Sequence, residues 1–66
     1  MSRLSFKSFC IEYYAEHAGV GSAEAYRVFK ENGVLEMLDA DYEDLHGMSW
    51  EYLMGMFDEC LGQRAI

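Results

Sequence analysis

Apolar positions recur at helical spacing along most of the chain, and glycines divide them into segments. The first segment, from Ser5 to about Ala18, follows the i, i+3, i+4, i+7 spacing of one helix face. That face consists of Phe6, Phe9, Cys10, Tyr13 and the amphipathic His17, with Ile11, Tyr14 and Ala18 extending it to one side. A stripe this wide predicts a helix that packs on more than one neighbour, at the centre of the fold.

A second, short helix is predicted from about Ala23 to Glu31. The run Gly19-Val20-Gly21 interrupts the chain before it, and Ser22 is placed to cap it by accepting a hydrogen bond from a free backbone N–H. Its inward positions are Ala25, Val28 and Phe29. Asn32-Gly33 then provides a left-handed stop signal.

The remaining apolar pattern predicts a broken helix followed by a regular one. From Val34 to His46 the pattern is interrupted by Asp39-Ala40-Asp41, which indicates a tight turn or kink, and Gly47 closes the segment. Ser49 is placed to cap the last helix. Its apolar arc is formed by Trp50, Leu53, Met54, Phe57, Cys60 and Leu61, opposite Glu51, Gly55, Asp58 and Glu59.

No window shows the strict alternation of a half-buried strand, so the expected fold class is all-α. The pattern predicts a compact bundle of about four short helices, with the third helix broken. A chain of 66 residues can form only one hydrophobic core. Residues 1–66 are therefore expected to be a single helical domain with its core at about 5–62.

Charge narrows the classes of partner. Twelve acidic residues against five basic ones give a formal net charge of −7, which repels nucleic acids and anionic membrane surfaces and favours a basic protein partner. Cys10 and Cys60 lie within helical patterns and are expected to be buried free thiols, as is typical of a reducing cytosol. No signal peptide or membrane span is evident, which predicts a cytoplasmic protein.

The most distinctive segment carries five acidic residues within nine positions and no base. We expect partner binding at Glu36, Asp39, Asp41, Tyr42, Glu43 and Asp44. The alternative is that these side chains simply form a solvated face, with Tyr42 and Trp50 in the core. A helix-turn-helix interpretation fails because the helix that would read DNA has no Lys or Arg to contact phosphate.

Motifs that carry chemistry are weak in this sequence. Asp39-x-Asp41-x-Glu43 resembles the start of a calcium loop, but Asp44 occupies the glycine position and Trp50 the glutamate position. The chain offers no local zinc spacing among its His and Cys residues, and no lysine follows Gly19-Val20-Gly21-Ser22 as in a P-loop. Cys10 and His17 are about 10 Å apart along a helix, too far for a catalytic pair. We therefore expect no cofactor, no metal and no enzymatic activity.

Several short motifs together resemble a small bacterial family of unknown function. They are Phe6-x-x-Phe9-Cys10-Ile11-Glu12, Ala25-Tyr26-x-x-Phe29, Gly33-Val34-Leu35, Tyr42-x-x-Leu45-His46-x-Met48 and Glu51-Tyr52-Leu53. The resemblance spans about residues 6 to 62 and implies a helical protein of about 70 residues. It also implies an association with genes for ADP-ribosyltransferase-like toxins, and so an antitoxin-like or accessory role.

The leading functional hypothesis is a cytosolic protein-interaction module that binds a basic protein surface through the acidic segment, with neutralisation of a toxin or enzyme as one form of it. A structural homo-oligomer, in which the wide apolar first helix is shared between subunits, is the alternative. A metal- or thiol-dependent enzyme is the third. His46 lies within one of the motifs above and is either a polar anchor or a capping or core histidine.

Overall fold

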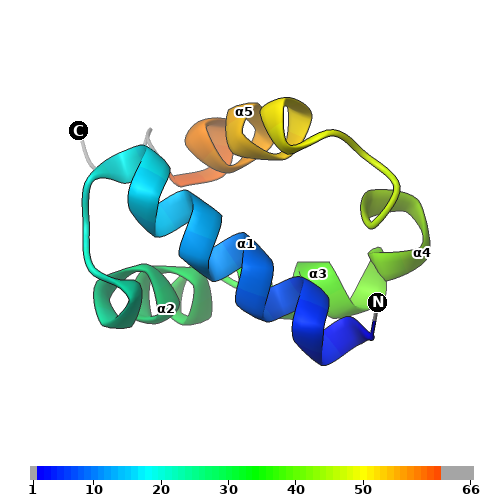
Figure 1. Ribbon diagram of the computed structural model, residues 1–66. Coiled ribbons are helices and arrows are strands. Elements are labelled where there is room, and N and C mark those ends of the chain that lie inside the picture. The colour runs from blue at the N-terminus through cyan, green and yellow to red at the C-terminus, as the bar shows by residue number, and fades with distance from the viewer. Residues whose placement is uncertain (1, 62–66) are drawn as a thin grey trace.

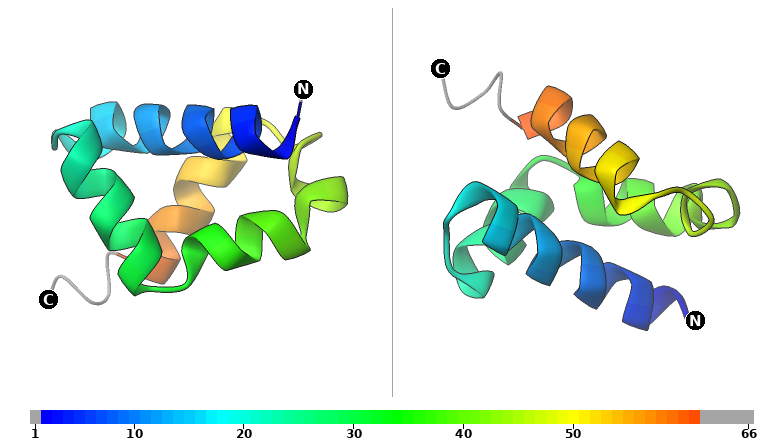
Figure 2. Two further views of the ribbon diagram at one scale, coloured as in Figure 1. Left: turned by 90° about the horizontal axis from the view of Figure 1, so that it is seen from below. Right: turned by 45° about the horizontal axis from the view of Figure 1, so that its top comes forward.

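A computed structural model describes residues 2–61, which form five helices and no strand. The helices are α1 (Arg3–Ala18), α2 (Ser22–Glu31), α3 (Val34–Ala40), α4 (Tyr42–Leu45) and α5 (Trp50–Leu61). In Figures 1 and 2, α1, α2 and α3 form a U-shaped frame, and α5 lies across one side of it. The predicted all-α bundle is confirmed, and so is the broken third helix, which is interrupted at Asp41.

Local caps explain where the long helices begin and end. The Ser2 hydroxyl accepts a hydrogen bond from the Ser5 N–H at 3.1 Å, so α1 begins two residues earlier than predicted. Gly19 ends α1 with a φ of +73°, and the Val20 N–H bonds the Ala15 carbonyl at 2.9 Å in a Schellman motif. Gly33, also at a φ of +73°, separates α2 from α3.

The two predicted serine caps have different outcomes. Ser49 accepts a hydrogen bond from the Tyr52 N–H at 3.1 Å, which confirms it as the cap of α5. The Ser22 prediction is wrong, since Gly21 occupies the cap position and the Ser22 hydroxyl donates to the Glu12 carboxylate of α1. The hydroxyl thus ties α2 to α1 and leaves the backbone uncapped by a side chain.

One core joins the described helices. Its buried members are Phe6 and Cys10 of α1, Phe29 of α2, Val34 and Leu38 of α3, Leu45 of α4, and Leu53, Phe57 and Leu61 of α5. The rings of Phe29 and Phe57 lie 5.0 Å apart, and the Tyr14 ring packs on both, so α1, α2 and α5 meet in one aromatic cluster. The predicted core limit at residue 62 lies outside the described residues.

The orientation of α1 differs from the prediction. The helix buries Phe6, Cys10 and Ala15, whereas Phe9 and Tyr13 remain 45% and 44% exposed and His17 lies on the surface. Cys10 is buried as expected, but Cys60 is exposed near the end of α5, so the prediction of two buried thiols is wrong for Cys60. The neighbours of α1 therefore select one side of its wide stripe for the core and leave aromatic rings in solvent.

Candidate interaction surfaces

The predicted acidic segment lies on α3, α4 and the break between them. Glu36, Asp39, Asp41, Glu43 and Asp44 are all exposed, whereas Tyr42 is half-buried. The Tyr42 ring packs edge-on against Phe6 at 5.5 Å and stacks on His46 at 4.7 Å. Tyr42 thus holds α4 against α1, and the acidic side chains around it face solvent.

The start of α1 partly neutralises this acidic segment. The Lys7 ammonium pairs with Asp39 at 2.9 Å, and the Arg3 guanidinium lies 5.1 Å from the centre of the Tyr42 ring. Exposed pairs of this kind contribute about 0–1 kcal/mol to stability. Their main effect is therefore to place the two basic side chains beside the acidic segment. Two of the five bases of the chain are therefore drawn to this side of the molecule.

His46 serves the local structure of α4. Its Nδ1 lies 2.8 Å from the Tyr42 carbonyl oxygen, and because a carbonyl can only accept, Nδ1 must carry the proton. The imidazole also stacks on the Tyr42 ring. This geometry matches the expectation of a capping histidine.

A second surface, which the sequence did not single out, runs between α1 and α5. It consists of Phe9 and Tyr13 of α1 with Trp50 and Met54 of α5, and we call it the aromatic surface. The rings of Tyr13 and Trp50 lie 4.4 Å apart, and Phe9 lies 6.3 Å from Tyr13. Three shallow hollows adjoin along it: the middle one shares Tyr13 with a hollow beside Phe9 and shares Trp50 and Met54 with a hollow along α5. Together they form one trough across both helices.

Carboxylates border the aromatic surface. Glu12 and Glu16 of α1 and Glu51 and Asp58 of α5 line the same trough, and among its described lining residues there is no Lys or Arg. Asp58 accepts a hydrogen bond from His17 Nε2 at 2.8 Å, which joins α1 to α5 beside the trough. The surface therefore combines flat apolar rings with a negative border.

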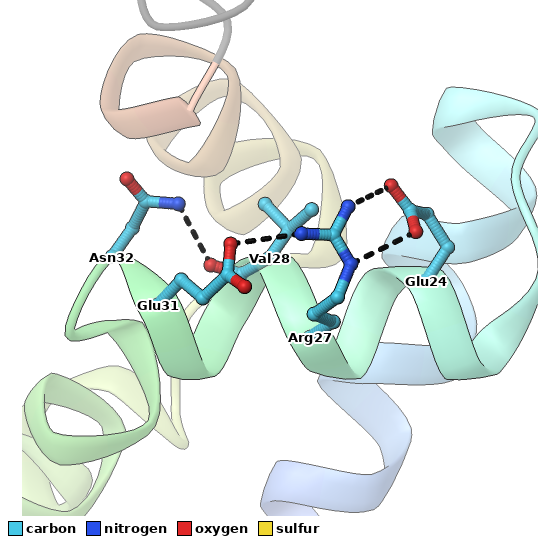
Figure 3. A network of polar contacts seen from close by, with 5 residues as sticks. All are labelled: Glu24, Arg27, Val28, Glu31 and Asn32. Carbon is cyan, nitrogen blue, oxygen red and sulfur yellow. Dashed lines mark hydrogen bonds and ion pairs between the residues drawn. The ribbon is translucent and has the colours of Figure 1, made fainter.

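The outer face of α2, by contrast, is occupied by its own polar contacts. Figure 3 shows the Arg27 guanidinium held between Glu24 and Glu31, with an Nη1 to Glu31 distance of 2.8 Å, and the Asn32 amide donating to the Val28 carbonyl at the same distance. The hydrogen bonds that Arg27 donates to the Glu24 and Glu31 carboxylates raise the pKa of its guanidinium. These polar groups already have hydrogen-bond partners within α2. This face is therefore a weaker candidate for partner binding than the aromatic surface.

Cys10 and Cys60 are both free thiols, the first buried and the second exposed. Burial raises the pKa of Cys10 to about 12, so its thiol stays protonated near neutral pH. Among residues 2–61, no group of three or more His, Cys, Asp and Glu side chains is arranged to hold a metal ion. Over the same residues, none of the helices has the length and apolar character needed to cross a bilayer.

Apolar spacing alone does not show which residues of a helix remain exposed, so it does not predict the aromatic surface. Phe9, Tyr13, Trp50 and Met54 all satisfy the helical apolar spacing, which predicts core positions. Trp50 and Met54 are half-buried and do pack against the core, whereas Phe9 and Tyr13 are exposed. The only available signal was that the stripe on α1 is wider than one interface requires.

Fold and surfaces together define a small all-α domain with one core and an exposed aromatic surface bordered by acids. The model of a family described as protein of unknown function (DUF3791) matches residues 5–64. The chain belongs to this family. No curated protein and no solved structure matches the chain.

Proposed function

We propose that this protein is an interaction module whose partner is a protein with a basic and partly apolar surface. The observation that carries the proposal is the aromatic surface, where Phe9 and Tyr13 are nearly half exposed beside Trp50. Large, rigid rings bury much area at low entropic cost and are frequent at the energetic centres of interfaces. The carboxylates around them favour Lys and Arg on the partner.

The acidic segment of α3 and α4 extends this preference for a basic partner. Of its carboxylates, Asp39 is already paired with Lys7, which leaves Glu36, Asp41, Glu43 and Asp44 as exposed charges available to a partner. Exposed charges of this kind mainly accelerate association and select the partner, while buried rings hold the complex together. We therefore assign the acidic segment to attraction and the aromatic surface to affinity.

In its narrower form, the proposal identifies the partner as a toxin or enzyme encoded by a neighbouring gene and neutralised in the cytoplasm. It is supported by the negative charge of the chain and by the family resemblance, and it requires no reaction catalysed by this chain. The test is to mix the purified protein with the product of the adjacent gene and measure complex formation by calorimetry. Absence of a complex contradicts this narrower form.

The role of the aromatic surface is tested with matched variants in the complex with the adjacent gene product. The double change Phe9→Ser and Tyr13→Ser is expected to weaken binding at least tenfold, whereas Tyr26→Ser, on α2 and 48% exposed, is expected to leave it unchanged. Asp41→Asn with Asp44→Asn is expected to slow association. Equal effects of the double variant and of Tyr26→Ser would refute the role of the aromatic surface.

The second candidate is a homo-oligomer in which two copies cover each other's aromatic surface. The exposed Leu4, Phe9 and Tyr13 of α1 favour it because they leave much of that helix uncovered. The acidic border opposes it, since pairing of two identical surfaces brings like charges together. Sedimentation equilibrium that shows a monomer at all accessible concentrations would eliminate this candidate.

A further inference from the structure

The helix α5 buries one side in the core, and its outer side carries apolar and acidic residues together. Leu53, Phe57 and Leu61 are buried, while Tyr52 remains 54% exposed on the outer side. Exposed apolar side chains with a polar border often mark protein–protein contact sites. The outer face of α5 thus has the composition of a contact surface.

Gly55 lies at the centre of that outer face. A hollow of about 290 Å³ on one side of it is lined by Tyr52 and Met56, and one of about 430 Å³ on the other side by Trp50 and Met54. The glycine therefore forms a low point between two apolar hollows, one of which belongs to the aromatic surface.

Nothing within the described chain requires a glycine at this position. Its φ is not positive, unlike those of Gly19 and Gly33, and a Cβ added to it would meet no atom within 4 Å. Glycine inside a helix is unfavourable relative to alanine, so its presence calls for an external reason. Close approach of a binding partner to the backbone is one established use of glycine.

We propose that α5 receives an amphipathic, basic helix of a partner protein, which crosses α5 at Gly55 and places apolar side chains in the two hollows. Carboxylates of Glu51, Asp58 and Glu59 line these hollows and select Lys or Arg beside the apolar positions of the incoming helix. This inference rests on the proposed function and specifies the partner's binding element.

Charge decides between a partner helix and a second copy of α5. Two copies of α5 crossing at Gly55 would bring Glu51 and Glu59 of one copy near those of the other, in a chain of net charge −7. A helix rich in Lys and Arg meets the same carboxylates with opposite charge. The basic helix is therefore the occupant that fits both the apolar hollows and their border.

The experiment uses two synthetic helical peptides of 18 residues that share one leucine face, with Lys on the remaining positions of one peptide and Glu on those of the other. Trp50 is the only tryptophan of the chain and lines one of the hollows, so its fluorescence reports binding directly. We expect the Lys peptide to bind and to shift the Trp50 emission, and the Glu peptide to do neither.

Gly55→Leu is expected to weaken binding of the Lys peptide at least tenfold by filling the crossing point. Ala23→Leu, at an exposed position of α2, is the matched control and should have no effect. Circular dichroism and the melting temperature of each variant establish that the fold is retained, and Gly55→Ala provides a smaller change at the same position if Gly55→Leu fails to fold.

The outcomes separate this inference from the proposed function. If Tyr13→Ser abolishes binding of the Lys peptide but Gly55→Leu and Gly55→Ala do not alter it, the crossing at Gly55 is wrong and the interaction module stands. If both peptides bind equally, or if neither binds, the inference of a basic helix as the occupant is wrong. The proposed function is still tested separately, with the product of the neighbouring gene. A dimer that Gly55→Leu dissociates would identify a second copy as the occupant and overturn the inference.

Discussion

Replacing Gly55 by alanine is expected to stabilise the free protein. Glycine in a helix interior costs about 0.5–1 kcal/mol relative to alanine because it loses more backbone freedom on folding. The added methyl group meets no atom within 4 Å, so no packing penalty offsets this gain. At about 4–8 °C per kcal/mol for a domain of this size, the melting temperature should rise by about 2–8 °C.

Gly33→Ala is the matched control, because it adds the same methyl group in equally open space. Gly33 has a φ of +73°, and a side chain in that left-handed conformation costs about 1–2 kcal/mol. Gly55→Ala should therefore raise the free energy of unfolding and Gly33→Ala should lower it. The two variants should differ from each other by about 1.5–3 kcal/mol. Urea unfolding followed by far-UV circular dichroism measures both free energies.

A decrease in the free energy of unfolding of Gly55→Ala would refute the reasoning, because it would mean that the outer face of α5 is not open. A gain in stability combined with weaker binding of the Lys peptide would be the trade-off expected of a residue kept for its partner. The stability measurement thus tests the structural premise, and the peptide titration tests its functional use.

Four further predictions follow from the core, the α5 cap and the two cysteines. Ser49→Ala should lower the free energy of unfolding by about 1 kcal/mol through loss of the α5 cap, and no change in urea unfolding would contradict that role. Phe57→Ala should cost about 3–5 kcal/mol, comparable to the whole stability of so small a domain, so circular dichroism should show a largely unfolded chain. Ellman's reagent should react promptly with the exposed Cys60 but with Cys10 only after unfolding. Because burial raises the pKa of Cys10 from 9.0 to about 12, folding favours its protonated form. The corresponding stability is complete below about pH 9 and declines as the pH rises toward 12, which urea midpoints across that interval would detect.

The sequence was sufficient for the helices because their ends carry local signals. Gly33 adopts the left-handed conformation expected of Asn32-Gly33, the run from Gly19 to Gly21 separates α1 from α2, and Ser49 caps α5 as expected. The break at Asp41 also followed from the interruption of the apolar pattern. Each of these features depends on neighbouring residues along the chain, which sequence reasoning can evaluate.

The rotation of α1 and the partner of Ser22 could not be obtained in this way. Either side of the α1 stripe satisfies helical spacing, and only the packing of α2, α3 and α5 selects Phe6 and Cys10 over Phe9 and Tyr13. The Ser22 hydroxyl likewise bonds Glu12 on another helix, a contact with no local signal. Whether the acidic segment binds a partner also depends on that partner and remains a prediction.

The uneven placement of charge has a kinetic consequence. Arg3 and Lys7 lie against the acidic segment, while the described lining of the trough between α1 and α5 contains carboxylates and no Lys or Arg. A cationic molecule diffusing nearby would be attracted by the acidic segment and turned toward the carboxylates of that trough before any contact forms. Raising the ionic strength should then reduce the association rate constant far more than it alters the dissociation rate constant.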